Sequence, residues 1–432
     1  MLKRLRRFFG ILGPGVITGA ADDDPSGIGT YSVAGASYGF AFNWVCSLLV
    51  PLMVAVQEMC ARIGLVTGKG LAGVIRNNYA KPILLFSTTL LLVANTINIG
   101  ADIGAMGAVL QMVLPFNLAF WAIISTVAIL LLEVFFSYRV YSKILKWLVV
   151  SLFAYILTAL VIRPCGLGTS VGSVCIDWVS AIKHLFIPTI NLSKEFLLVF
   201  VGFLGTSISP YLFFWQASEE VEEEVQEHKI FAMGKGRPKV GRKDLKDMRF
   251  DNFIGMLFSQ VATFFIVVTT AATLFATNHH NIQSAAQAAE ALRPLAGNFA
   301  YLLFAIGILG VGLLGIPVLA GSAAYALSEG FGWREGLYLK FKRAHGFYGV
   351  ITIATLVGLL INFIGINPIQ ALLYAAVVNG VIAVPLIAII IFISNNKKIM
   401  GERVNGVWSN SLGWIAFGLM GLAAVAMIFT LL

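Results

Sequence analysis

Residues 19–29, GAADDDPSGIG, place three acids and a proline in the middle of an otherwise apolar segment. Proline lacks an amide donor and clashes with the preceding turn, and the flanking glycines lower the cost of unusual backbone dihedrals. The stretch therefore predicts a helix that breaks at its centre. In lipid, non-helical backbone is tolerated only where it lines a cavity or is buried in protein, and acids at that depth usually have a function.

The rest of the chain has the composition of a membrane protein. Of its 432 residues, 58% are hydrophobic and 12% are charged, about half the charged fraction of a soluble domain. Apolar stretches near the roughly 20 residues that a spanning helix needs recur throughout, and no polar linker divides them. We predict an all-α membrane protein with one transmembrane domain over residues 1–432. Its eleven spans are expected at about 11–36, 42–61, 83–114, 119–136, 144–162, 195–227, 250–277, 298–328, 346–363, 370–394 and 408–432.

The basic residues predict the orientation. If the N-terminus is cytoplasmic, 26 of the 30 Lys and Arg residues fall in inner segments and 4 in outer ones, as expected when positive charge is retained inside. This favours a plasma (inner) membrane location with the C-terminus outside. The first apolar segment is interpreted as a membrane helix and not as a cleavable signal. The net charge of +9 is then a topology signal, and no nucleic-acid partner is expected.

A second interruption lies in the sixth span, at residues 202–211, GFLGTSISPY, where Thr206, Ser207 and Ser209 add oxygen atoms. Taken alone, it could be an ordinary proline kink. The two breaks fall in spans one and six, which are the first spans of two sets of five. Because the sets are offset by five spans, an odd number, the second set crosses the membrane in the opposite direction from the first. This is the layout of an inverted repeat with a site between its halves. We expect repeat one at about 11–162, repeat two at about 195–394 and an extra helix at about 408–432.

Asp24, next to the proline, is the favoured metal ligand at the first break. Neighbouring residues on a helix point about 100° apart, so Asp22 and Asp23 are expected to serve hydration or structure. The carbonyl of Thr206 and the hydroxyl of Ser209 are secondary candidates. Carboxylate and carbonyl oxygens suit a hard divalent cation. An alternative remains, in which the acids cap the start of a re-entrant helix.

Other acids at membrane depth are candidates for a polar or proton pathway. Asp102 lies deep in the third span and is the better candidate, while Glu58 lies in the second span and Glu133 near the end of the fourth. All five histidines fall in predicted loops, so none is available as a proton relay in the middle of the membrane.

The predicted loops contain two further features. Cys165 and Cys175 lie in the longest outer loop and form either a disulfide or two free thiols. In the inner loop, the acids between Glu219 and Glu227 precede eight Lys and Arg residues. We interpret this stretch as a solvated helix end followed by a flexible loop.

Several of these residues resemble the NRAMP family of divalent metal transporters. Asp24-Pro25-Ser26-Gly27 is similar to that family's Asp-Pro-Gly-Asn motif, and residues 57–68, QEMCARIGLVTG, resemble the inner end of its helix 2. Shorter likenesses at 138–139, 303–307 and 399–401 extend the resemblance over essentially the whole chain. It implies a LeuT-like fold, with broken helices 1 and 6, and import of metals such as manganese and iron, usually with protons. No cofactor is implied beyond the transported metal.

The departures from the family concern its ligands. Gly27 stands where the family has an asparagine, Ser209 where it has a methionine, Tyr211 where it has a histidine and Ala376 where it has a glutamine. The family's helix 9 arginines have no counterpart between residues 348 and 362. The resemblance thus implies Gly27 as a metal-site position and Tyr211 as a pathway position.

Loss of the thioether removes the ligand that favours soft transition metals. An all-oxygen site suits Mg²⁺ or Mn²⁺, as in the magnesium-transporting relatives. Without the histidine and the arginines, uptake driven by the membrane potential becomes an alternative to proton coupling.

We therefore expect a secondary transporter that imports a divalent cation by alternating access. The main alternative is a cation-coupled LeuT-like symporter of a small organic solute or amino acid, for which Gly27, Ser209 and Ala376 would leave room. A receptor without transport activity would not need the acids in the middle of the membrane. An enzyme is not expected, because no nucleophile–base pair or metal triad is evident. The sequence does not indicate an oligomeric state.

Overall fold

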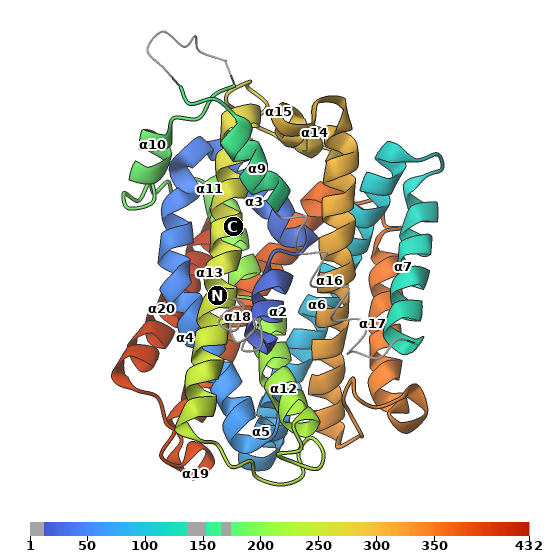
Figure 1. Ribbon diagram of the computed structural model, residues 1–432, viewed down its shortest axis with the longest axis vertical. Helices are drawn as coiled ribbons and strands as arrows, with labels where there is room; N and C mark the ends of the chain where they lie inside the picture. Colours follow the sequence, from blue (N-terminus) through green and yellow to red (C-terminus); the bar gives the residue numbers. More distant parts are fainter. Residues whose placement is uncertain (1–12, 136–152, 166–173, 432) are drawn as a thin grey trace, which may run out of the picture.

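A computed structural model describes residues 13–135, 153–165 and 174–431 of the chain, which form a bundle of helices (Figure 1). Five short helices lie at the ends of the bundle: α5 (Leu71–Asn78), α10 (Trp178–Lys183), α14 (Ala285–Ala289), α15 (Arg293–Ala296) and α19 (Lys397–Met400). The helices that build its body are α2 (Pro14–Asp22), α3 (Pro25–Tyr38), α4 (Asn43–Thr67), α6 (Lys81–Val113), α7 (Leu118–Phe135), α9 (Phe153–Val161), α11 (Lys194–Ser207), α12 (Pro210–Gln226), α13 (Arg242–Thr270), α16 (Ala300–Phe331), α17 (His345–Ile361), α18 (Pro368–Asn395) and α20 (Val407–Leu431).

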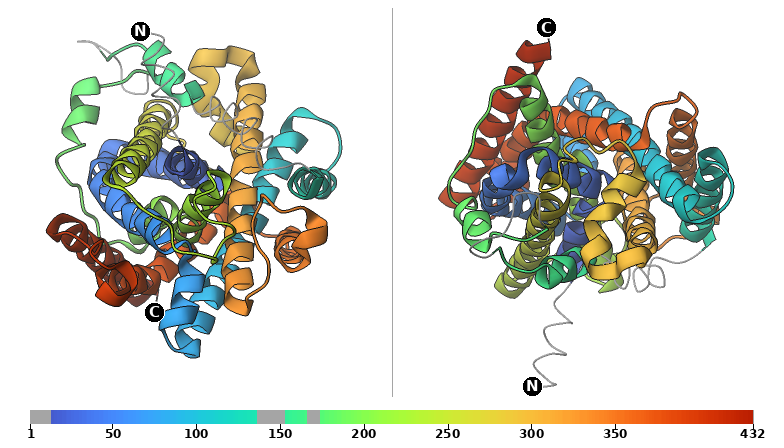
Figure 2. Two further views of the ribbon diagram at one scale, coloured as in Figure 1. Left: turned by 60° about the horizontal axis from the view of Figure 1, so that its bottom comes forward. Right: turned by 90° about the horizontal axis from the view of Figure 1, so that it is seen from above.

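The order of the predicted spans is confirmed wherever the chain is described. Eight helical segments have the length and hydropathy needed to cross a membrane, and one of them, Pro25–Thr67, contains most of the first two predicted spans. The ninth span is the shorter apolar helix α17, and the fifth is described only from Phe153 onward. Residues 138–139 lie outside the described part of the chain. Viewed along and across the bundle, α20 lies on the opposite side from α7 and α17 (Figures 1 and 2).

The connections gather at two ends of the bundle. α5 and α19 lie at one end, and α10, α14 and α15 lie at the other (Figure 1). Cys165 and Cys175, beside α10, form a disulfide with 5.0 Å between their Cα atoms. Of the two alternatives for these cysteines, the structure therefore has the bonded pair.

Both predicted helix breaks are confirmed. α2 ends at Asp22, and Asp24 has an extended backbone (φ −64°, ψ 176°) before Pro25 begins α3. α11 ends at Ser207, and Ser209 is likewise extended (φ −93°, ψ 140°) before Pro210 begins α12. Proline favours an extended residue before it and suits the first position of a helix, so each proline ends one half-helix and starts the next.

The charged C-terminal end of α12 differs from the expectation of a solvated helix end. The helix continues to Gln226, and Glu220, Glu222 and Glu224 are buried. Glu222 accepts hydrogen bonds from the Tyr325 hydroxyl and the Leu337 amide. Neighbouring elements cover this end of the helix, and the sequence pattern of α12 alone did not reveal them.

Glycines set how closely α2 approaches α13. A Cβ on Gly15 would lie 2.7 Å from the backbone of Asn252, and one on Gly255 would lie 2.1 Å from the Gly15 carbonyl oxygen. A Cβ on Gly19 would likewise lie 2.2 Å from the Gly255 carbonyl oxygen. These contacts leave no space for a side chain, so the first half-helix is held against α13 backbone to backbone.

We predict that Gly255→Ala lowers the thermal unfolding midpoint of the purified protein. Overpacking of a tight contact typically costs about 1–3 kcal/mol. Gly307→Ala in α16 is the matched control, because a Cβ there meets nothing within 4 Å and alanine is the better helix former. If both variants unfold at the same temperature as the wild type, the result would contradict the close backbone contact between α2 and α13.

Candidate functional site

Asp24 lies at the first helix break and is almost fully buried, with 1% of its surface exposed. Its Oδ1 accepts hydrogen bonds from the Ser26 hydroxyl (2.6 Å) and the Gly27 amide (2.9 Å), and so caps the start of α3. Its Oδ2 accepts from Asn98 Nδ2 (3.0 Å) and from the Tyr211 hydroxyl (3.2 Å). The carboxylate therefore joins α3 to α6 and to α12.

A line of polar side chains leads from Asp24 across α6. Asn98 Nδ2 also donates to Asp102 Oδ2 at 3.2 Å, and Asn98 Oδ1 accepts from Asn379 Nδ2 of α18 at 3.0 Å. Asp102 Oδ1 has no hydrogen-bond partner among the described residues. The structure thus connects Asp102, predicted for a polar pathway, to Asp24 through one amide.

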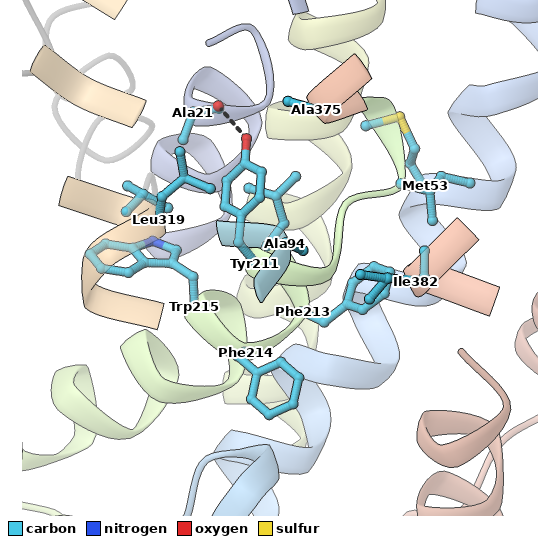
Figure 3. Packing of buried hydrophobic residues seen from close by; sticks show 14 of the residues in the cluster. Ala21, Met53, Ala94, Tyr211, Phe213, Phe214, Trp215, Leu319, Ala375 and Ile382 are labelled. Atoms are coloured by element: carbon cyan, nitrogen blue, oxygen red, sulfur yellow. Dashed lines mark hydrogen bonds between the residues drawn. The ribbon is translucent and has the colours of Figure 1, made fainter. Parts of the chain in front are cut away.

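Tyr211 closes the site from the second break. Its hydroxyl donates to the Ala21 carbonyl oxygen at 2.8 Å (Figure 3). The same hydroxyl also donates to Asp24 Oδ2. The ring comes from the first turn of α12, while Ala21 is in the last turn of α2. One side chain therefore links the two interrupted helices.

Asp22 and Asp23 bond to a different helix from the partners of Asp24. Asp22 Oδ2 accepts from Ser259 Oγ, and Asp23 Oδ1 accepts from Thr263 Oγ1 at 3.3 Å, both on α13. Asp22 Oδ1 and Asp23 Oδ2 have no hydrogen-bond partner in the part of the chain that the structure describes. These two acids connect the break to α13, and Asp24 connects it to α6 and α12.

The second break provides two carbonyl oxygens, and each of them accepts a hydrogen bond from the same hydroxyl. Ser209 Oγ donates to the Gly205 and Thr206 carbonyl oxygens at 2.5 and 2.8 Å. These carbonyls belong to the last turn of α11, where helical partners are missing. The Ser209 hydroxyl keeps its acceptor lone pairs, and the Thr206 carbonyl oxygen keeps a second lone pair, so both can take a further partner.

Gly27 lies where the two breaks meet. A Cβ at this position would lie 3.0 Å from the Asp22 carbonyl oxygen and 3.2 Å from Thr206 Oγ1. Its own amide donates to Asp24. Gly27 therefore positions the carboxylate and brings the halves together, and it contributes no side-chain ligand.

Glu58 does not join the Asp24 group. It forms ion pairs with Arg62 (3.0 Å) and Arg249 (2.9 Å), and Arg62 donates to the Arg403 carbonyl and to Asn405. Glu58 is therefore a partner in a separate ionic network, and a role in the pathway of Asp102 stays a prediction. The ion pair between Glu58 and Arg249 fastens α4 to α13. The hydrogen bonds of Arg62 fasten α4 to the segment between α19 and α20.

The donor atoms around the break are those of a small, closed site. Asp22, Asp23 and Asp24 are each at most 1% exposed. Among the described residues, no three Asp, Glu, His or Cys side chains lie close enough together to hold a metal ion. Any cation at this site would therefore be held by Asp24 together with neutral oxygens, such as backbone carbonyls, hydroxyls, amides and water.

Two amides of this site were missed from the sequence. Asn98 was part of a polar stretch but was not assigned a role, and Asn379 was not singled out. Each is a buried amide on an apolar membrane helix, and such a side chain usually has a polar partner. The family has a glutamine at the position of Ala376. The buried amide side chain of α18 is instead Asn379, which lies about one helical turn later.

Comparisons with known proteins cover nearly the whole chain. A family model described as natural resistance-associated macrophage protein-like (Nramp) matches residues 15–430. The divalent metal cation transporter MntH of Bacillus subtilis is 28% identical over 423 residues, covering 95% of this chain and 91% of that protein. MntH of Klebsiella pneumoniae is 26% identical over 410 residues, covering 94% and 90%.

Solved structures support the fold. The manganese transporter of Eremococcus coleocola superposes with a TM-score of 0.72 at 14% identity, covering 96% of this chain and 85% of that one. Mhp1, a nucleobase-cation-symport-1 family transporter, superposes with a TM-score of 0.52 at 14% identity, covering 97% and 92%. At these identities the likeness concerns the fold alone, which is the predicted LeuT-like arrangement.

We predict that Asp24→Asn lowers the unfolding midpoint of metal-free protein, whereas Asp22→Asn leaves it unchanged or raises it. An N–H group donates to each oxygen of Asp24, from Gly27 to Oδ1 and from Asn98 to Oδ2. Either orientation of an asparagine amide therefore sets a donor against a donor, at a cost of about 1–3 kcal/mol. Asp22 can keep its bond to Ser259 as an amide and loses an unpaired buried charge. Equal destabilisation of the two variants would contradict this account.

Proposed function

The chain belongs to the Nramp family, and from this premise we propose that it is a secondary transporter that imports a divalent metal cation by alternating access. The observation that carries the proposal is the buried carboxylate of Asp24 between two helix breaks. Half-helix ends with free carbonyls beside a carboxylate are a known means of binding cations in the middle of a membrane. The relatives named MntH are divalent metal cation transporters.

The proposed ion is Mg²⁺ or Mn²⁺. Asp24, the Thr206 carbonyl and Ser209 offer only oxygen, which suits hard cations. A thioether does occur near the break, on Met106, where it packs over Gly312. An ion such as Mg²⁺, which keeps several of its waters, would need few direct protein ligands.

Movement at the two breaks is the proposed basis of alternating access. The acids at the first break are shut off from solvent, so an ion can reach them only if helices move. Hinges are commonly a few residues at the ends of helices. Residues 23–24 and 208–209 have non-helical backbone between half-helices and meet this description. Asp22 and Asp23, bonded to α13, are proposed to support the first hinge.

The proposed driving force is the membrane potential. A divalent cation gains about 4.6 kcal/mol on crossing 100 mV. Tyr211 stands where the family's histidine would be, and it serves as a hydrogen-bond donor to Asp24. We further propose a plasma membrane location with the N-terminus inside. The distribution of Lys and Arg supports this orientation, as does a disulfide at the end opposite α5 and α19, because disulfides persist in oxidising surroundings.

The alternative, a symporter of an organic solute, has less support. A symporter of this kind would need free space for its substrate at Gly27, Ser209 and Ala376. Gly27 packs against Asp22 and Thr206, and a Cβ on Gly205 would lie 2.1 Å from the Ala376 carbonyl oxygen. This close packing favours a small ion over a larger substrate.

Uptake by the protein in liposomes tests the proposal. We expect Mg²⁺ or Mn²⁺ uptake by the wild type, and loss of at least nine-tenths of it in Asp24→Ala, because the carboxylate that is bonded to both breaks is then missing. Asp177→Ala is the control, since this exposed acid caps α10 at one end of the bundle.

The same vesicles test the alternatives. Uptake of amino acids without uptake of divalent cations would contradict the proposal and favour a solute symporter. A dye that reports the internal pH would detect protons entering with the metal, and acidification that depends on the metal would overturn potential-driven transport.

Ser209→Met tests whether the second break lines the ion site. A thioether at this position should raise the uptake of Mn²⁺ or Cd²⁺ relative to Mg²⁺ several-fold, because sulfur favours softer metals. The Mg²⁺ rate in the same vesicles is the internal control for folding and insertion. An unchanged metal preference in a protein that still transports Mg²⁺ would mean that Ser209 does not line the site.

A further inference from the structure

A second acidic site lies at the inner end of the bundle, away from Asp24. A cavity of about 130 Å³ opens there between α2, α4, α12 and α13. Among the residues that the structure describes, Lys229 is the only basic one that lines it, and it is paired with Glu227 (2.8 Å) and Asp244 (3.0 Å). The acids that line this cavity, which we call the acidic cavity, are Glu220, Glu223, Glu224, Glu227, Asp244, Asp247 and Asp251.

Glu224 distinguishes the acidic cavity from an ordinary charged surface. This residue is only 2% exposed, and neither carboxylate oxygen has a hydrogen-bond partner among residues 13–135, 153–165 and 174–431. A buried carboxylate without a partner is costly unless a cation or a proton compensates it. Glu220, one turn away and also buried, has a single amide donor from Gln216 at 2.9 Å. Two buried carboxylates therefore line this space with little compensation.

The acidic cavity adjoins the half-helix that carries the first break. Asp251 accepts hydrogen bonds from the Gly13 amide (2.8 Å) and the Gly15 amide (2.6 Å), which holds the start of α2. Pro14, the first residue of α2, lines the same cavity. A change in the net charge inside the acidic cavity therefore changes the forces that hold the start of α2 against α12 and α13.

We propose that the acidic cavity binds a hydrated divalent cation, at a site separate from Asp24. No three carboxylates among the described residues are close enough to hold a bare ion, so the ion keeps much of its water, as Mg²⁺ commonly does. Glu223 and Glu227 are exposed and form the rim through which it enters. The bound ion offsets the repulsion between acids of α12 and α13 and steadies α2 between them. This inference goes beyond the transport proposal and does not rest on it.

The test measures Mn²⁺ binding to the full-length purified protein by the electron paramagnetic resonance signal of free Mn²⁺. Asp24→Ala serves as the background, so that the central site does not contribute. We expect one remaining site with a Kd on the order of 10⁻⁴ to 10⁻³ M, the range of weak carboxylate sites. Adding Glu224→Gln should weaken this binding at least tenfold, and Glu224→Lys should abolish it because the lysine supplies the cation.

Glu402→Gln in the same background is the matched control, because Glu402 is exposed in the segment after α19 and does not line the cavity. Binding that is absent in the background protein, or that Glu224→Gln leaves unchanged, overturns the proposal. Size-exclusion profiles and unfolding midpoints establish folding, and the isosteric Glu224→Gln decides the result if Glu224→Lys misfolds. Uptake assays on Asp24→Ala alone test transport, so the two proposals fail separately.

Discussion

The structure depends on satisfying one carboxylate that is buried inside a membrane-embedded bundle. An unpartnered charge at that depth is costly, and Asp24 meets this cost with four hydrogen bonds, from Ser26, Gly27, Asn98 and Tyr211. Two of the donors belong to the half-helix that the carboxylate caps, and two come from other helices. The position of α3 relative to α6 and α12 is therefore fixed at the point where backbone hydrogen bonds are missing.

The surrounding packing follows from the same constraint. A helix that ends and restarts inside the bundle must be held from outside, and glycine contacts between α2 and α13 hold the first half at backbone distance. Ser259 and Thr263 of α13 bind the neighbouring acids. At the second break, Ser209 satisfies the exposed carbonyls of α11. Each interruption thus has local hydrogen bonds that stabilise it when no ion is bound, and an ion must replace some of them.

Much of this architecture could be predicted from the sequence, because its signals are local. Asp-Pro and Ser-Pro within apolar segments predict the two breaks, and the 100° spacing separates Asp24 from Asp22 and Asp23. The partners could not be predicted in this way. Asn379 meets Asn98 across 281 positions of sequence, Glu58 pairs with Arg249 on another helix, and other elements cover the glutamates of α12. These contacts depend on which helix faces are adjacent in three dimensions, and a single sequence has no local signal for that.

The central claim is that Asp24, between the two breaks, binds the transported ion. The most direct test is anomalous diffraction from crystals of the protein soaked in Mn²⁺. The account predicts an anomalous peak between the α2–α3 and α11–α12 joins, with an Asp24 carboxylate oxygen about 2.0–2.2 Å away. A structure at full Mn²⁺ occupancy whose anomalous peaks all lie elsewhere, with Asp24 still bonded only to its four protein donors, would contradict it.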